Sequence, residues 1–589
     1  MCLQSGPCPI CGYSPETFSS LTHDFATLTD TANNTALLVQ RTTQIDELIL
    51  RLRQERTRTQ QKLNLLNAST RHLPDDILST IFRFVCPPID FDQYFSYQYK
   101  TEYHQAEAGF CAEDMPNPQL VLTAVSSHWR QVARSTPYIW STLSLGIHDQ
   151  NIQRRISLLE LYSENSGGIP LSIGFDFEDN GQTNGQTSRV TWARFMNILE
   201  DAPQSSTTTG GGTASGVSVL LQELLQKLGS LKLKCLRLNS PFPQWLPFLP
   251  DTFRDLEQLS IGWVDAWRAL EGQFSRSSQS FRLTNPSSLR KLAIHGVMSS
   301  AVSIQLNWDM LRELTLDRVK YPLCIDLLIS CNNLRSFRSL RPDYYLDAQE
   351  SQRTLPSFDP LKLEHLTWSF PSSSSTTSIN SSLLECLRLP YIQSLHLIGI
   401  LETDSRDVLP AVVLLPGMTS FIEHLPSPVP SLTIEIHDNP HTFKLTEILE
   451  RWVSTPSLNL NRFCIQGVCP YVAAQICTLI KSKGRFTAQT IELHVGARKI
   501  CQILRPSRRE GTQTYQRAAD CSSSLDPMVV LDMLSRRETG RQPKFILELG
   551  DDCPHPTSWD REVWERMREM NTDDLEVILQ HGGKEISWV

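Results

Sequence analysis

Leu311-Arg312-Glu313-Leu314-Thr315-Leu316 is the clearest copy of a pattern that recurs in the second half of the 589-residue chain. In this Leu-x-x-Leu-x-Leu pattern, the last two leucines alternate with one other residue, so both point to the same face of a strand. The residue between them points to the opposite face. Four clear copies follow one another, and they begin at Leu233, Leu256, Leu289 and Leu311. The pattern predicts a series of short strands that share one buried face.

Weaker copies extend the series toward the C-terminus. They begin at Leu334, Leu363, Leu384, Ile392 and Leu460. Up to the copy at Leu384, the central residues are 21 to 33 positions apart, a spacing that predicts a leucine-rich-repeat solenoid with units of unequal length. The asparagine that bonds the turn backbone in such repeats is mostly missing, so we expect irregular units, about eight to eleven in all. The alternative interpretation is a set of unrelated α/β strands.

The residues between the two core positions of each copy are the candidate target-binding residues. In a solenoid the strands line the concave face, so these residues are expected to face outward onto that sheet. The candidates are Arg237, Thr315, Thr367 and Arg388. They form a mixed surface with little charge bias. This predicts a protein ligand rather than nucleic acid, which would require a basic stripe.

Residues 73–82, LPDDILSTIF, predict a different kind of structure near the N-terminus. Pro74 suits the first turn of a helix, and the two aspartates that follow complement the positive end of the helix dipole. Several apolar residues then form one stripe at helical spacing. They are Ile77, Ile81 and Phe84, with Leu78 and Val85 beside them.

A second amphipathic segment lies at residues 117–145. Val121, Val125, Trp129 and Val132 fall at i, i+4, i+8 and i+11, which predicts one helix with Trp129 on its core side. Thr136-Pro137 begins a third short helix that leads to Trp140. Three short helices are too few to form a large core, so part of their apolar surface is expected to contact a partner.

These two segments resemble an F-box, the module that docks substrate receptors onto the adaptor of SCF-type (cullin-RING) ubiquitin ligases. The resemblance covers residues 73–86 and 117–145, and an aromatic-rich insert at residues 87–116 separates its two parts. The layout is similar to the F-box-like proteins that mushroom-forming fungi carry in large families. The resemblance implies an adaptor-binding surface made of Leu73, Pro74, Ile77, Leu78 and Ile81.

Cys8 and Cys11 form a CxxC turn that could supply two thiolates to one zinc ion, with Cys2 and His23 as further ligands. No second CxxC follows at the spacing of a zinc finger. The favoured interpretation is two reduced cysteines in a flexible terminus, so no metal and no cofactor is expected. The fifteen cysteines of the chain, an odd number, indicate reduced thiols in the cytoplasm or nucleus.

Residues 36–67 have the pattern of a long polar helix. Leu38, Ile45, Leu52 and Leu66 fit a seven-residue spacing as in a coiled coil, with Thr59 interrupting the series. Most of the matching d positions are charged, which predicts weak self-association at most.

Composition and motifs exclude several function classes. The net charge is −8, so the chain as a whole offers no basic surface for nucleic acid. No apolar run reaches the roughly 20 residues needed to span a membrane, and no signal peptide is expected. We find no phosphate-binding loop, metalloprotease motif or nucleophile elbow, so the chain is not expected to be an enzyme. Histidines beside the predicted strands, such as His295, His396 and His494, are expected to be ordinary surface or core groups.

The sequence therefore predicts an α+β chain with an N-terminal helix, a small all-α F-box-like module and an α/β leucine-rich-repeat-like solenoid. The expected domains are residues 1–30 with the CxxC turn, 31–70 with the polar helix, 71–145 with the F-box-like helices, 146–216 as a connecting region with a low-complexity loop, and 217–589 with the repeats. The connecting region is expected to hold a helix at residues 151–163 and a strand at residues 171–175.

The expected function is substrate recognition within a ubiquitin ligase. The expected partners are the SCF adaptor, a cullin reached through it, and a target protein bound by the repeats. One alternative is a scaffold in which the F-box-like helices cap the solenoid. The other is a zinc-dependent binding protein organised around Cys8 and Cys11. Neither nucleic acid nor a membrane is expected as a partner.

Overall fold

The structure is a computed structural model. It describes residues 35–67, 73–89, 117–146, 152–176, 223–224, 226–239, 255–262, 279–282, 288–296, 302–305, 308–342, 362–370, 377–399, 420–421, 424–426, 429–435, 460–468, 470–483, 488–496, 525–535, 544–550, 553, 555–571 and 575–586. Cys8, Cys11 and nearly all of the predicted insert lie outside these ranges.

The chain divides into two compact units. Unit 1 comprises Met1–Pro87 and Pro116–Ile139, and unit 2 comprises Pro88–Met115 and Trp140–Val589.

Unit 1 is helical. Its elements are α2 (Thr35–Asn67), α3 (Asp75–Val85), α5 (Pro118–Val125), α6 (Ser127–Arg134) and the start of the 3-10 helix η4 (Pro137–Ser141). The long helix predicted at residues 36–67 is confirmed as α2, and at about 1.5 Å per residue it is roughly 50 Å long. Nearly all described side chains of α2 are exposed, including Leu38, Leu48 and Leu52.

The single helix predicted across residues 121–132 is wrong, because the chain breaks at Ser126. The backbone of Ser126 is extended (φ −157°, ψ 167°), and its hydroxyl oxygen accepts a hydrogen bond from the Trp129 amide at 3.0 Å. Serine is among the preferred N-cap residues because its hydroxyl satisfies a free amide in the first turn. Ser126 therefore ends α5 and begins α6.

Unit 2 is built on one long sheet. Among the described residues this sheet has 15 strands, and all neighbouring strands are parallel except the last pair. The strands are β1 (Thr142–Gly146), β2 (Leu171–Asp176), β3 (Leu233–Asn239), β4 (Gln258–Gly262), β6 (Lys291–His295), β8 (Glu313–Asp317), β9 (Ser336–Leu340), β10 (His365–Ser369), β11 (Ser394–Ile398), β12 (Val429–Glu435), β13 (Leu460–Val468), β14 (Ala488–Val495), β15 (Lys544–Leu549), β16 (Glu576–His581) and β17 (Lys584–Glu585). They pair in chain order, so each unit of sequence adds the next strand. A separate parallel pair is formed by β5 (Gln279–Arg282) and β7 (Val302–Gln305).

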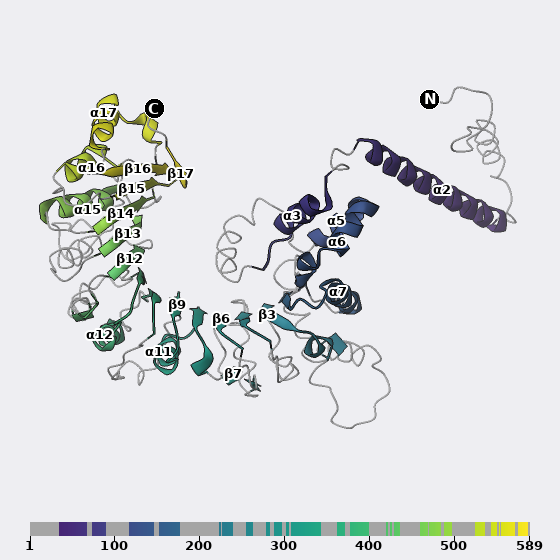
Figure 1. Cartoon of the computed structure of the whole chain (residues 1–589), viewed down its shortest axis with the longest axis horizontal. Helices are drawn as coiled ribbons and strands as arrows, with labels where there is room; N and C mark the ends of the chain where they lie inside the picture. The colour runs from purple at the N-terminus through teal and green to yellow at the C-terminus, as the bar shows by residue number, and fades with distance from the viewer. Residues whose placement is uncertain are drawn as a thin grey trace. The chain divides into compact units, whose positions relative to one another are not determined.

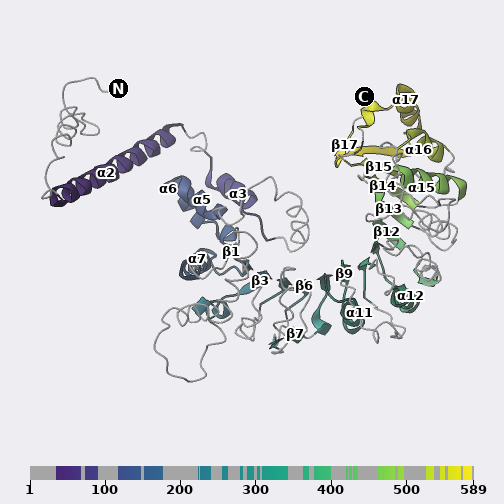
Figure 2. The ribbon, with the colours of Figure 1, turned by 180° about the vertical axis from the view of Figure 1, so that it is seen from behind.

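Helices lie on one side of this sheet (Figures 1 and 2). They are α7 (Ile152–Asn165), η7 (Trp308–Met310), α11 (Tyr321–Ser330), α12 (Thr377–Cys386), α15 (Pro470–Lys483), α16 (Pro527–Leu534), η10 (Pro556–Ser558) and α17 (Arg561–Met570). The leucines of the repeated pattern point to this covered side. Leu314 and Leu316 on β8 are buried, and so are Leu292 and Ile294 on β6. We call the opposite side the open face, since no described helix of unit 2 covers it.

Aromatic side chains fill the middle of the core. Trp368 on β10 is 2% exposed, and its ring lies 5.9 Å from that of Phe337 and 5.6 Å from that of Tyr321. The Tyr321 hydroxyl is fully buried, and burial raises its pKa. Strands β9 and β10 and helix α11 thus share one hydrophobic core.

One predicted strand is wrong. The copy at residues 384–389 is not a strand, because α12 runs to Cys386 and the Leu387 amide donates to the Leu383 oxygen as in a helix. The strand of this unit is β11, which corresponds to the copy at Ile392. The strand at residues 171–175 and the helix at residues 151–163 are confirmed as β2 and α7.

The α+β prediction is confirmed, with a long and mostly parallel sheet. No described helix is both long and apolar enough to cross a membrane.

Candidate functional site

Helix α3 carries apolar residues on two faces. Leu78 and Phe82 are 0% exposed and form the core of unit 1. Ile77, Ile81 and Phe84 lie on another face and are 44%, 38% and 82% exposed. The sequence pattern predicted a single stripe, but the packing divides it into a buried part and an exposed part. We call Ile77, Ile81 and Phe84 the exposed stripe.

Four contacts fix α3 against the other helices of unit 1. The Phe82 ring lies 5.1 Å from that of Trp129, and the Thr136 hydroxyl donates to Ser79 Oγ at 3.0 Å. His128 Nε2 lies 3.5 Å from an Asp75 carboxylate oxygen, and the Arg83 guanidinium lies 5.5 Å from the centre of the Tyr138 ring. These contacts hold the exposed stripe in a fixed orientation. Val85, Val121 and Val125 are also exposed on these helices.

The residues predicted to bind an adaptor are therefore divided. Pro74, Ile77 and Ile81 are exposed and Leu73 is half-buried, so a partner can reach them. Leu78 is wrong as a contact residue because it is fully buried inside unit 1. Trp129 is half-buried, and of its two predicted core neighbours Val132 is buried but Val125 is exposed.

On the open face of the sheet, the residues between the core positions form one continuous row. The strand register aligns Arg237, Ser260, Ala293, Thr315, Arg338, Thr367, His396, Thr433, Cys464, Glu492 and Ile546. Arg237 and Thr367 lie in this row, and both are half-buried. Thr315 is only 4% exposed, so it does not face outward freely as predicted. Ser260 and Ala293, the next two short side chains along the row, are buried as well, each 2% exposed.

Arg388 does not belong to the open face. It follows α12 outside any strand, and its guanidinium donates to the backbone oxygens of Glu385 and Leu387 at 2.6 and 3.3 Å. Its predicted position between two core residues of a strand is wrong, because the residues around it end a helix.

A buried ion-pair network lies where β6, β8 and β9 end. The Arg341 guanidinium donates to both carboxylate oxygens of Asp317 at 2.9 and 2.5 Å, and His295 Nδ1 lies 3.6 Å from Asp317. Burial would raise the pKa of Asp317, but the His295 hydrogen bond and the Arg341 charge outweigh it and lower this pKa. Burial lowers the pKa of His295, against the attraction of Asp317. The network is thus an ionised carboxylate held mainly by Arg341.

A second network links β13, β14 and β15. The Arg462 guanidinium donates to both oxygens of Glu492 at 2.7 and 2.5 Å, and His494 Nδ1 lies 2.5 Å from a Glu548 oxygen. The Cys464 thiol lies in the same group, and one possible ligand atom each from Cys464, Glu492 and His494 fall within 4.8 Å of one another.

This cluster fits an ion-pair network better than a metal site. Both Glu492 oxygens are already occupied by a guanidinium, whose charge would repel a cation. Burial, with the Glu492 charge beside it, raises the pKa of the Cys464 thiol to about 12. A thiol with such a pKa is protonated at neutral pH and is a poor metal ligand and nucleophile.

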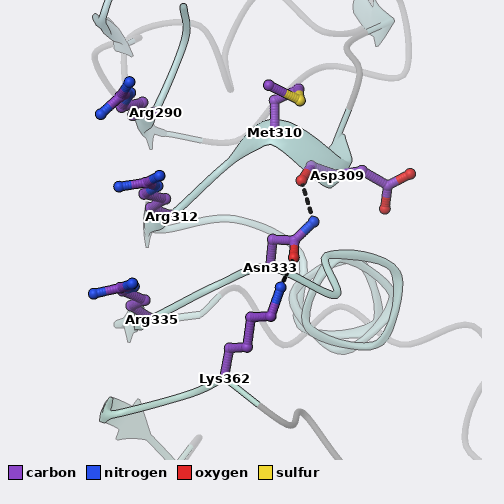
Figure 3. A pocket seen from close by; sticks show the side chains of 7 residues that line it. All are labelled: Arg290, Asp309, Met310, Arg312, Asn333, Arg335 and Lys362. Carbon is purple, nitrogen blue, oxygen red and sulfur yellow. Dashed lines mark hydrogen bonds between the residues drawn. The ribbon is translucent and has the colours of Figure 1, made fainter.

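A pocket of about 260 Å³ lies where several strands of unit 2 begin (Figure 3). Arg290, Arg312 and Arg335 occupy the same position immediately before β6, β8 and β9. The other lining residues are Asp309, Met310, Asn333 and Lys362. The three arginine side chains extend in the same direction, one above another. We call these three residues the arginine ladder.

The arginine ladder was missed in the sequence, although a signal exists. In three consecutive copies, an arginine stands two residues before the first core residue of the strand, as in Arg312-Glu313-Leu314. Only the parallel register shows that these positions become neighbours in space. No protein-family model matches the chain, and no curated protein matches it.

Proposed function

We propose that the chain is the substrate-recognition subunit of an SCF-type ubiquitin ligase. The exposed stripe on α3 supports this proposal, because it is an apolar surface that unit 1 itself does not bury. Phe84 at 82% exposure is the clearest case. Buried apolar anchors supply most of the binding energy at protein interfaces. In the proposal, the F-box-like helices bind the adaptor through Leu73, Pro74, Ile77 and Ile81.

The sheet of unit 2 supports the second half of the proposal. Its strands pair in chain order and its leucines point to one side, as in a leucine-rich-repeat solenoid. The other side presents charged and polar groups such as Arg237, Arg338 and Glu435. A wide, polar and preformed surface of this kind suits a protein target.

The proposal is tested by measuring adaptor binding with the purified full chain. Ile77→Ala combined with Ile81→Ala removes two exposed anchors and is expected to abolish binding to an SCF adaptor. Both side chains are well exposed, so the melting temperature should change little. Tyr391→Ala is the control, because it removes an exposed apolar side chain, 63% accessible, from unit 2. It should leave adaptor binding intact.

Two outcomes would favour a scaffold without ligase function. One is an unmodified chain that binds no adaptor. The other is a double variant that binds as well as the parent.

A further inference from the structure

The backbone of the sheet fixes the spacing between the three residues of the arginine ladder. The Arg312 amide donates to the Arg290 oxygen at 2.8 Å, and the Arg335 amide donates to the Arg312 oxygen at 2.8 Å. Each arginine is therefore tied to the next at the strand spacing, about 4.8 Å. The side chains leave this backbone in parallel, as Figure 3 shows. The spacing between the three positive groups follows from the fold rather than from loop conformation.

Most of this positive charge is not neutralised. Within the described part of unit 2, Arg290 and Arg312 have no acidic partner within ion-pair distance. Arg335 lies 3.7 Å from Glu364 but keeps 57% of its side chain exposed. Asp309, the acidic residue of the pocket, points away from the three arginines (Figure 3). The ladder can therefore accept an anion.

The opposite wall of the pocket is fixed by Asn333. Its side-chain nitrogen donates to the Asp309 backbone oxygen at 2.7 Å, and its oxygen accepts from Lys362 Nζ at 2.5 Å. These bonds connect η7, the turn before β9 and the segment just before β10. Met310, 42% exposed, adds an apolar surface beside the cations. The pocket thus offers a charged wall and a neighbouring apolar contact.

We propose that the arginine ladder binds a phosphorylated segment of a partner protein. Guanidinium groups bind phosphate oxygens through paired hydrogen bonds. A phosphate carries nearly two negative charges and three acceptor oxygens, so two arginines about 4.8 Å apart can share one phosphate. Carboxylates on one face of an extended peptide are about 6.6 Å apart, which matches this spacing less well. Met310 is placed to contact an apolar residue next to the phosphate.

Nucleic acid fits the ladder less well than a phosphopeptide. Tight binding to a duplex neutralises many phosphates along a basic stripe. Here the positive run stops after Lys362, and the next two strands of the sheet are preceded by Glu364 and Gln393. The run is also preceded by Glu257 before β4. A short cationic segment between uncharged or acidic neighbours suits one or two phosphates.

This proposal deepens the proposed function, since it names phosphorylated protein as the target class. The binding itself does not require the adaptor. Loss of adaptor binding in the Ile77/Ile81 variant and loss of phosphopeptide binding are therefore separate results, and either can fail alone.

The test uses the purified full chain and a peptide library with a fixed phosphoserine and degenerate flanking positions. An unphosphorylated copy of the library, inorganic tripolyphosphate and a single-stranded oligonucleotide serve as competing probes. The chain is expected to enrich phosphorylated peptides, with apolar residues near the phosphate. Arg290→Glu combined with Arg312→Glu should weaken binding of the best peptide by roughly tenfold or more. Arg312→Lys keeps the charge but loses the paired hydrogen bonds, so a smaller loss is expected.

Arg561→Glu combined with Arg566→Glu on α17 is the matched control. It makes the same change in net charge on exposed arginines of unit 2 and should leave peptide binding unchanged. Thermal unfolding of all variants checks that each is folded. The proposal is overturned if both libraries are captured equally, or if the ladder variant binds as well as the control. Preference for tripolyphosphate or the oligonucleotide over every peptide would also overturn it.

Discussion

Helix α3 of unit 1 and strand β8 of unit 2 use their apolar residues in opposite ways. Strand β8 buries both of its leucines and leaves only Glu313, Thr315 and Asp317 for the other face. Helix α3 buries Leu78 and Phe82 but exposes others, with Phe84 at 82%. A strand in a long sheet has neighbours and helices that cover its apolar face. A helix in the small helical unit 1 does not, so its second apolar face remains available to a partner.

The comparison is sharpest between two phenylalanines that lie two positions apart on α3. Phe82 is 0% exposed and contacts Trp129, whereas Phe84 is largely in solvent. Their chemistry is identical, so any difference between their variants reports on position alone.

The largest effect is expected for Phe82→Ala. Emptying a fully buried aromatic site typically costs about 3–5 kcal/mol of unfolding free energy. Urea unfolding of the parent and the variant, followed by far-UV circular dichroism, would measure the loss. A cost below about 1 kcal/mol would show that unit 1 is not organised around Phe82.

An intermediate effect is expected for Asp317→Asn, which removes the charge from the buried network on the sheet. Arg341 and His295 would lose their partner, at a cost of about 1–3 kcal/mol at pH 7. Asp309→Asn, at an exposed carboxylate of the same unit, is the control and should cost little.

The pH dependence of this variant follows from the lowered pKa of Asp317. A carboxylate with a depressed pKa stabilises the fold above its ordinary value, about 3.9, and loses this contribution as the pH falls through the folded-state value. The difference between parent and Asp317→Asn should therefore be full at pH 7 and shrink below about pH 4. A difference that grows on acidification would contradict the assignment.

The smallest effect on stability is expected for Phe84→Ala. An exposed side chain contributes little to folding, so the unfolding free energy should change by less than about 0.5 kcal/mol. Adaptor binding should nevertheless weaken if the exposed stripe is the interface. Unchanged stability together with unchanged binding would remove Phe84 from the proposed surface.

The strands of unit 2 were predictable where leucines alternate, and less so elsewhere. Strands β6 and β8 follow the pattern and are found where expected. Strand β14 has the same alternation at Ile491 and Leu493, but Ala488 stands where the pattern has its first leucine. The copy at Leu384 was misread because leucines three apart also fit one face of a helix. Spacing alone does not separate these two cases.

For the candidate site, the sequence predicted the face on which residues lie better than it predicted which of them are exposed. The pattern correctly placed Arg237 and Thr367 on the face opposite the leucines, but the 4% exposure of Thr315 depends on side chains of neighbouring strands. In the same way, Leu78 and Ile77 are adjacent in sequence, and only the packing of α3 decides which is buried. The arginine ladder depends on register between units that are more than twenty residues apart.

The two-residue strand β17 has a consequence for how molecules meet. It folds back on β16 through Gly582 and Gly583, both with positive φ, and pairs antiparallel with the end of that strand. An open strand edge is a template on which another chain can add its own strand, and proteins often protect it with short charged segments. Lys584 and Glu585 form such a segment, and both are exposed. The hairpin therefore opposes end-to-end polymerisation at this edge, where a parallel sheet could otherwise continue from one molecule into the next.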